Sequence, residues 1–252
     1  MIRAISFDFH DTLVRCDSWF QHEVYTLASD VLRYLANSSD DSCVRGLLGS
    51  RGDSVFPEAD ALYADIRKEA KASGREVSAQ AALVRVLNEQ LGADVSATQL
   101  GAALAQTQRA YLSDIAPTAG VAGALEQIAA LNLPLVVVSN AVYPPFLDWS
   151  LEGLGLRRYF GAVITSAGAG YYKTDKRIYQ AALAALGNPP AETVVHVGDS
   201  LPYDVAGAQA AGMRAIWYNP QRKPSDSQVA QPEAVIGEMS ELMQVINGLL
   251  ED

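Results

Sequence analysis

The chain has 252 residues and a formal net charge of −10, with 49% hydrophobic and 19% charged residues. This composition is typical of a globular protein, and the length suffices for one large domain or two modest ones. The charge argues against a nucleic-acid partner, because binding to the phosphate backbone relies on clustered Lys and Arg. The net charge is still compatible with a small phosphorylated ligand that binds in a local basic pocket.

Two cysteines, Cys16 and Cys43, are too few for a disulfide framework or a thiolate metal site, and we interpret them as spectator thiols. No apolar run approaches the roughly 20 residues that cross a bilayer, and the N-terminus lacks the apolar region of a signal peptide. These features predict a cytoplasmic protein without membrane contact. They leave open whether it is a monomer or a homodimer.

The first stretch of interest is an apolar run, Ala4–Phe7, that ends abruptly at Asp8. A short run of this kind predicts a buried strand of a parallel sheet. Ligands of open α/β sheets bind beyond the carboxyl ends of the strands, so we expect Asp8 at that edge. Taken alone, the stretch also fits an ordinary strand followed by a polar turn.

Residues 15–115 have a helical pattern throughout, with apolar residues at steps of three and four. Four amphipathic helices are predicted to begin near Asp17, Pro57, Ser78 and Ser96. A glycine-containing loop, residues 46–52, is expected between the first and second helices. Short connections between such helices predict a four-helix bundle.

From Pro117 onward, short apolar runs alternate with helical segments, which predicts a Rossmann-like α/β domain with a parallel sheet. Strands are predicted over residues 135–138, 163–165, 194–197, 215–218 and 234–236. A glycine-rich loop is expected before Lys173. The first strand therefore belongs to this later domain, so that residues 1–14 and 116–252 form a discontinuous core and residues 15–115 an inserted helical domain.

Polar residues follow several of these strands or lie in the loops after them. They are Asp8-Phe9-His10-Asp11-Thr12, Ser139-Asn140, Lys173, and Gly198-Asp199-Ser200 with Asp204. Each motif is short and weak alone, but their order and places, with a helical block after the first, resemble the haloacid dehalogenase superfamily. Most members of that superfamily are phosphatases, and the resemblance covers nearly the whole chain.

The resemblance implies a Mg²⁺-dependent phosphoric monoester hydrolase that acts on a small phosphorylated metabolite. Asp8 would be the nucleophile that forms an aspartyl-phosphate. Asp8, the backbone carbonyl of His10 and Asp199 would hold Mg²⁺, and Asp204 would orient the ligands of the metal.

The resemblance also implies the groups that bind phosphate. Thr12, Ser139 and Asn140 would hold phosphate oxygens, and Lys173 would neutralise charge on Asp8 and the phosphoryl group. Carboxylates about 4 Å apart repel by roughly 4 kcal/mol at an effective dielectric near 20, so several together need cations.

Single residues among these also have plain structural interpretations. Ser139 could cap a helix, Lys173 could be a surface lysine, Asp199 a turn residue and Asp204 a helix cap. His196 is interpreted as a packed strand histidine.

His10 stands where phosphatases of this family usually have a second Asp that acts as general acid and base. Imidazole, with a reference pKa near 6.5, can do the same work near neutral pH. An inert His10 would cost roughly 10²- to 10⁴-fold in rate and leave a slow enzyme that prefers good leaving groups. Both interpretations stay open.

Two rival functions follow from the same resemblance. One is a metal-independent 2-haloacid dehalogenase using the same nucleophile, and the other is a degenerate member that binds a phosphorylated ligand with little turnover because of His10. Asp199 and Asp204 favour the metal-dependent phosphatase, since the dehalogenases of the family lack this pair. A phosphonate-cleaving enzyme would need a Schiff-base lysine, but Lys68 and Lys71 lie on a solvated helix face.

The inserted domain is expected to choose the substrate. Trp19, Phe20 and the arginines of the glycine-containing loop, Arg45 and Arg51, are candidates, and so are Tyr171 and Tyr172. The alternatives are that Phe20 is bundle core and that both arginines are solvated. His22 is predicted to be solvated.

Overall fold

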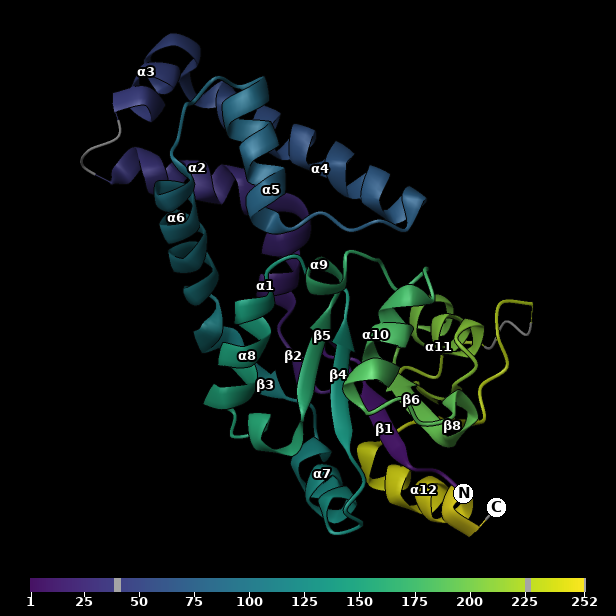
Figure 1. Cartoon of the computed structure of the whole chain (residues 1–252). Helices are drawn as coiled ribbons and strands as arrows, with labels where there is room; N and C mark the ends of the chain where they lie inside the picture. The colour runs from purple at the N-terminus through teal and green to yellow at the C-terminus, as the bar shows by residue number, and fades with distance from the viewer. Residues whose placement is uncertain (39–41, 225–227, 252) are drawn as a thin grey trace. The chain divides into compact units, whose positions relative to one another are not determined.

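The structure is a computed structural model that describes residues 1–38, 42–224 and 228–251 (Figure 1). The side chains of residues 42 and 43 are not described, so the prediction for Cys43 lies outside the described residues. The chain forms two compact units: Met1–Arg15 with Ile115–Asp252, hereafter the core unit, and Cys16–Asp114, the helical unit.

A six-stranded parallel sheet forms the centre of the core unit, with the order β5-β4-β1-β6-β7-β8. The strands are β1 Ala4–Phe7, β4 Leu135–Ser139, β5 Ala162–Thr165, β6 Val194–Gly198, β7 Arg214–Tyr218 and β8 Ala234–Ile236. The predicted α/β fold with a parallel sheet is confirmed. The apolar side chains of β1, β4 and β6 are buried on both faces, which explains their nearly continuous hydrophobic sequences.

The register of β1 places the site. Phe7 pairs with Val137 of β4 on one side and with Val197 of β6 on the other. The chain order therefore reverses around β1, and ligands of open α/β sheets bind at such a switch point. Asp8 comes directly after β1 at this point.

Helices cover both faces of the sheet (Figure 1). They are α7 Val121–Ala129, α8 Pro144–Gly153, α9 Ser166–Ala169, α10 Arg177–Ala185, α11 Ala206–Ala210 and α12 Leu242–Glu251, with a π-helical turn Leu201–Val205 before α11 and 3₁₀ turns Arg157–Tyr159, Ala191–Thr193 and Met239–Glu241. A short antiparallel pair, β2 Val14–Arg15 and β3 Ala116–Pro117, forms a separate two-stranded sheet. The loop predicted before Lys173 contains α9, because the Thr165 hydroxyl accepts a hydrogen bond from the Gly168 N–H and caps a helical turn.

The helical unit is richer in helices than the predicted bundle. It contains α1 Asp17–Gln21, α2 Leu27–Asn37, α3 Ser42–Arg51, α4 Val55–Ser73, α5 Ala79–Leu83 and α6 Ala97–Arg109, with π-helical turns His22–Thr26 and Val84–Gln90 and 3₁₀ turns Gly52–Ser54 and Leu112–Asp114. Ser78 and Ser96 cap α5 and α6 as predicted, Ser96 in a capping box with Gln99. The loop predicted over residues 46–52 is wrong, since α3 runs to Arg51 and glycine merely lowers helix stability.

Side-chain burial answers two further expectations for the helical unit, those for Phe20 and His22. Trp19 is 1% exposed and donates a hydrogen bond to Gln108, whereas Phe20 is 40% exposed, so Phe20 is not bundle core. His22 is buried, contrary to the prediction, because its ring is hydrogen-bonded to Asp30 at 2.7 Å and stacks on Tyr111. Within the described residues, no helix is both long enough and apolar enough to span a bilayer.

Candidate active site

Three acidic side chains converge at the carboxyl edge of the sheet. Asp8 follows β1, Asp199 follows β6, and Asp204 lies in the π-helical turn before α11. One carboxylate oxygen from each lies within 4.8 Å of the others. Residues separated by some 190 positions in the chain are therefore brought to one place, as expected where parallel strands end together.

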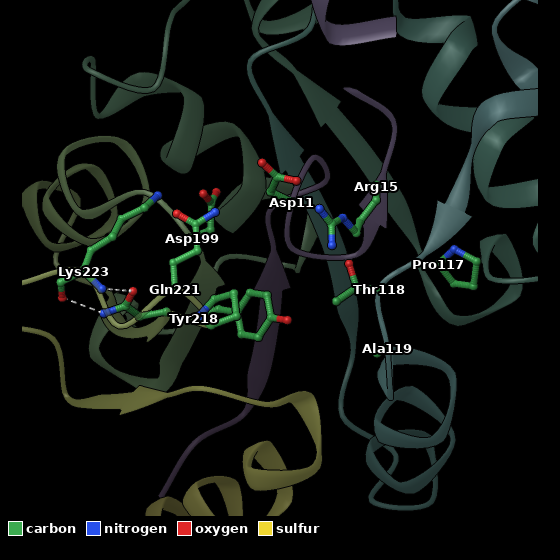
Figure 2. Close-up of a pocket in the computed structure, with 11 residues that line it drawn as sticks. Asp11, Arg15, Pro117, Thr118, Ala119, Asp199, Tyr218, Gln221 and Lys223 are labelled. Atoms are coloured by element: carbon green, nitrogen blue, oxygen red, sulfur yellow. Dashed lines mark hydrogen bonds between the residues drawn. The ribbon is translucent and has the colours of Figure 1, made fainter. Parts of the chain in front are cut away.

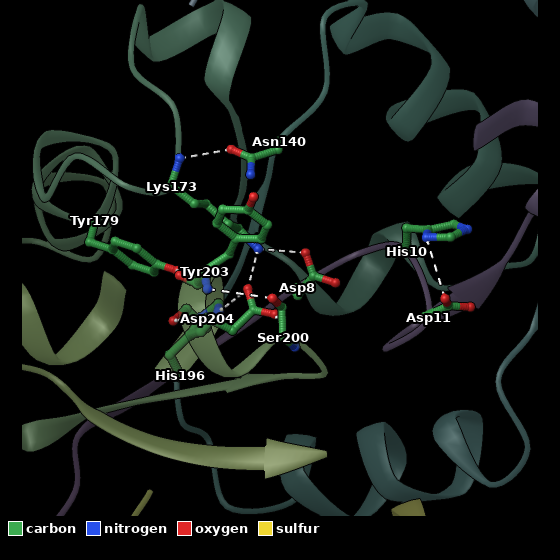
Figure 3. A network of polar contacts seen from close by, with 11 residues as sticks. Asp8, His10, Asp11, Asn140, Lys173, Tyr179, His196, Ser200, Tyr203 and Asp204 are labelled. Atoms are coloured by element: carbon green, nitrogen blue, oxygen red, sulfur yellow. Dashed lines mark hydrogen bonds and ion pairs between the residues drawn. The ribbon is translucent and has the colours of Figure 1, made fainter. Parts of the chain in front are cut away.

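Lys173 lies between two of these carboxylates and is only 2% exposed (Figure 3). Its Nζ donates hydrogen bonds to Asp8 Oδ1 at 2.5 Å and to Asp204 Oδ1 at 2.6 Å. Its backbone N–H donates to Asn140 Oδ1 at 2.8 Å, so the loop after β4 fixes the lysine. A surface lysine is thus excluded.

Asp204 is held from three sides. Besides Lys173, the His196 ring lies 3.2 Å from Asp204 Oδ1, and the Ser200 N–H donates to Oδ2 at 2.9 Å. Because a carboxylate only accepts, His196 Nε2 carries the proton, and His196 Nδ1 accepts from the Ser6 hydroxyl at 2.8 Å. Ser6, His196, Asp204 and Lys173 thus form a buried chain of polar contacts.

The sequence predicts a packed strand histidine at His196 and no functional role for Ser6. Ser6 and His196 are directly opposite in the β1–β6 register, and both are fully buried. Two polar residues inside otherwise apolar strands were the available signal, because a buried polar side chain needs a hydrogen-bond partner.

Gly198 leaves the space that Asp204 occupies. A Cβ at Gly198 would lie 2.5 Å from Asp204 Oδ2 and would collide with the rest of that carboxyl group. Gly207 must lack a side chain for the same steric reason, since a Cβ there would lie 2.5 Å from the Lys173 carbonyl oxygen. The absence of side chains at these two positions allows Asp204 and the Lys173 loop to approach.

The charges of the cluster are unbalanced. Burial raises the pKa of Asp8 to about 7, with Lys173 opposing the rise and Asp204 adding to it. Burial and the nearby Asp8 raise the pKa of Asp199 to about 8. Burial alone would raise the pKa of Asp204, but the Lys173 ammonium and the His196 hydrogen bond hold it well below its usual range. Burial likewise opposes the charge on Lys173, but Asp204 and Asp8 raise its pKa.

These shifts test whether a divalent cation fits. Three carboxyl groups share one ammonium, and two of them avoid the excess negative charge by retaining protons near neutral pH. A divalent cation with oxygen ligands would supply the missing charge, and it would release those protons. The donor set therefore suits a divalent metal, with Asp8 and Asp199 as the carboxyl groups whose protons it would displace.

The remaining predicted residues lie around this cluster. Thr12 is fully buried, and its Oγ1 has no hydrogen-bond partner among the described residues. Ser139 is 3% exposed at the end of β4. Tyr172 packs edge-on against Tyr203, and Tyr171 packs under Arg177.

His10 differs from the others in its orientation. Its ring points away from the Asp8–Lys173 pair and faces Asp11, with His10 Nδ1 3.6 Å from Asp11 Oδ2 (Figure 3). Asp11 has a φ of 60°, a left-handed conformation that Asp tolerates better than most residues. The chain turns sharply here, with the Leu13 and Val14 N–H groups both donating to the Phe9 carbonyl.

Comparisons with known proteins agree with this geometry. The family model described as haloacid dehalogenase-like hydrolase matches residues 2–212. A phosphoserine phosphatase from Thermus thermophilus is 33% identical over 62% of this chain and 60% of its own length, less than two thirds of that protein. A glyceraldehyde 3-phosphate phosphatase from Methanopyrus kandleri is 26% identical over the whole of both chains.

A solved structure extends the comparison to the fold. The 2-haloacid dehalogenase from Pseudomonas syringae pv. Tomato DC3000 superposes with a TM-score of 0.67 at 26% identity, over 98% of this chain and 99% of that one. The motif residues, their convergence at the switch point and the family match over 2–212 lead to one conclusion. The chain belongs to the haloacid dehalogenase-like hydrolases.

Proposed function

We propose that the protein is a Mg²⁺-dependent phosphohydrolase that cleaves a phosphomonoester of a small metabolite through a phosphorylated Asp8. The observation that carries this proposal is the cluster of Asp8, Asp199 and Asp204 with the buried ammonium of Lys173. A cluster with this excess of acid suits the attack of a carboxylate on a phosphoryl group whose charge is neutralised by cations.

Asp8 is the nucleophile in this reaction. Its Oδ1 is bound by Lys173, which leaves Oδ2 to attack phosphorus in line with the leaving oxygen. The bond from Asp8 Oδ2 to phosphorus forms as the bond from phosphorus to the leaving oxygen breaks. A water molecule then attacks phosphorus, the bond to Asp8 breaks, and inorganic phosphate and the free carboxylate are restored.

Lys173 and Asp204 prepare the nucleophile. Asp204, itself held by His196 and Ser200, keeps Lys173 protonated and directed at Asp8. The ammonium stabilises the Asp8 carboxylate and the charge that develops on the phosphoryl oxygens. Mg²⁺, held by Asp8, Asp199 and the backbone carbonyl of His10, would neutralise phosphoryl charge as well. Ser139, Asn140 and Thr12 are the proposed contacts to phosphate.

His10 is the proposed proton carrier. Its imidazole would give a proton to the leaving oxygen in the first step and take one from the attacking water in the second. This requires its ring to turn from Asp11 toward the leaving group. If the ring stays beside Asp11, the enzyme works best on aryl phosphates, whose leaving oxygens need no proton.

A second candidate is hydrolysis of a carbon–halogen bond by Asp8. The structural similarity to a 2-haloacid dehalogenase at 26% identity favours it. The two further carboxyl groups beside Asp8, those of Asp199 and Asp204, argue against it, because a metal-free reaction would leave this excess of acid without a cation to balance it.

Hydrolysis of an aryl phosphate with and without Mg²⁺ tests the proposal. We expect turnover that requires Mg²⁺. Asp8→Asn should abolish it, and His10→Ala should reduce it only in part. The control Asp148→Asn should leave turnover intact, since Asp148 lies on α8 and pairs with Arg157. A phosphoenzyme that accumulates in His10→Ala would assign the second step to His10. Halide release from a 2-haloacid in EDTA, or aryl-phosphate turnover by Asp8→Asn, would overturn the proposal.

A further inference from the structure

A cavity of about 370 Å³ lies beside Asp199 within the core unit (Figure 2). Its walls come from the β2–β3 pair, the turn after β3, and the loop after β7. Its lining includes Arg15, Thr118, Tyr218 and Lys223, with Asp11 and Asp199 where the cavity meets the acidic cluster. The proposed hydrolysis uses neither the arginine nor the threonine.

Thr118 is a polar group without a partner at the wall of this cavity. It is 5% exposed, and its Oγ1 is buried without a hydrogen-bond partner in the part of the chain that the structure describes. Its backbone is fixed, since the Thr118 N–H donates to the Leu13 carbonyl at 3.0 Å. A buried hydroxyl without a partner is costly, and a ligand oxygen would remove that cost.

Two cations line the cavity from opposite walls. Figure 2 shows the Arg15 guanidinium turned inward above Thr118, and the Lys223 side chain extending from the other side of the cavity toward Asp199. Across the described ranges, neither cation takes part in an ion pair. Asp199 belongs to the acidic cluster, so the rest of the lining carries two positive charges and the single carboxylate of Asp11.

The loop that carries Lys223 is held in place. The Asn219 side-chain amide donates to the Lys223 carbonyl and accepts from the Lys223 N–H, both at 2.9 Å. The Asn219 N–H donates to the Ile236 carbonyl of β8 at 2.7 Å. The lysine therefore extends from a loop that is anchored to the sheet, so little ordering of backbone accompanies ligand binding.

We propose that this cavity binds a small oxyanion, a carboxylate or phosphate group, through Arg15, Lys223 and the Thr118 hydroxyl. A planar guanidinium and a hydroxyl donor are the groups that recognise such anions. The anion comes either from a second acidic group of the substrate, an assignment that rests on the proposed function, or from a separate molecule bound next to the active site.

Anion binding is tested without turnover by titrating the Mg²⁺-loaded protein with sulfate, which the proposed reaction does not hydrolyse, in a calorimeter. Arg15→Gln, Lys223→Gln and Thr118→Val are each compared with Arg222→Gln, which removes a neighbouring charge that does not line the cavity. We expect Arg15→Gln and Lys223→Gln each to weaken sulfate binding at one site by about tenfold or more, because each change removes one charge-assisted contact. Arg222→Gln should leave sulfate binding intact. Thr118→Val keeps the shape and should weaken the same site.

The source of the anion is tested with two substrates, phenyl phosphate and 4-carboxyphenyl phosphate. If the substrate supplies the anion, the ratio of their kcat/KM values favours the carboxylated ester and falls about tenfold in Arg15→Gln but not in Arg222→Gln. An unchanged ratio with Arg15-dependent sulfate binding assigns the site to a separate anion. Sulfate binding that is absent, or the same in all variants, overturns the proposal, and this result stands whether or not the protein hydrolyses phosphate esters.

Discussion

Gly198→Ala is the smallest change that should break the cluster of Asp8, Asp199, Asp204 and Lys173. The new methyl group would collide with the Asp204 carboxyl group. Gly198 cannot retreat, because β6 is hydrogen-bonded to β1 on one side and to β7 on the other. Asp204 must move instead, and it then loses its contacts to Lys173, His196 and Ser200.

The loss in the free energy of unfolding follows from the contacts that Asp204 loses. Overpacking alone costs about 1–3 kcal/mol. Removing one partner from a buried ion pair costs about 3–5 kcal/mol, and Asp204 and Lys173 are both 2% exposed. The second effect is the larger, so we expect the free energy of unfolding of the core unit to fall by about 3–5 kcal/mol.

Urea unfolding measures this loss, and a Mg²⁺ titration of the folded variant measures the accompanying loss of metal affinity. The control is Gly123→Ala, because Gly123 is exposed in α7 with no atom within 4 Å of its would-be Cβ. That change should stabilise the protein by about 0.5–1 kcal/mol. A Gly198→Ala protein with the stability and Mg²⁺ affinity of the unmodified chain would refute the reasoning.

Three further outcomes are expected. Mg²⁺ affinity should rise from pH 6 to pH 8, and Mg²⁺ binding should release protons, because the pKa values of Asp8 and Asp199 are raised to about 7 and 8. Calorimetry in buffers of different ionisation enthalpy measures the released protons, and no proton release at pH 6.5 would contradict the expectation. For the same reason, the metal-free protein binds the protons of Asp8 and Asp199 more tightly when it is folded than when it is unfolded. The contribution of these protons to the free energy of unfolding is therefore complete below about pH 4 and is lost as the pH rises to about 8. Urea unfolding in EDTA should accordingly show a larger contribution at pH 5 than at pH 8. Lys173→Met should destabilise the core unit by about 3–5 kcal/mol at pH 8 and by less at pH 5, and an equal loss at both values would argue against charge as the cause.

Much of the core unit could be predicted from the order of its residues. Short apolar runs such as Ala4–Phe7 form strands wherever they are placed between helices, and a polar residue directly after each run falls at the carboxyl edge of the sheet. Capping serines also act locally, so the starts of α5 and α6 at Ser78 and Ser96 are visible in the sequence. Glycines were less informative, since α3 continues through Gly46 and Gly49.

Other features depend on contacts between distant residues, and only the tertiary structure decided them. The chain from Ser6 through His196 to Asp204 exists because β1 and β6 are paired in one register, and a shift by one residue would turn Ser6 to the other face. The burial of His22 depends on its contacts with Asp30 and Tyr111. The cavity at Arg15 and Thr118 joins segments about 100 residues apart. Local sequence preferences determine which elements form and where they end, but the free energy of pairing and packing determines which side chains meet.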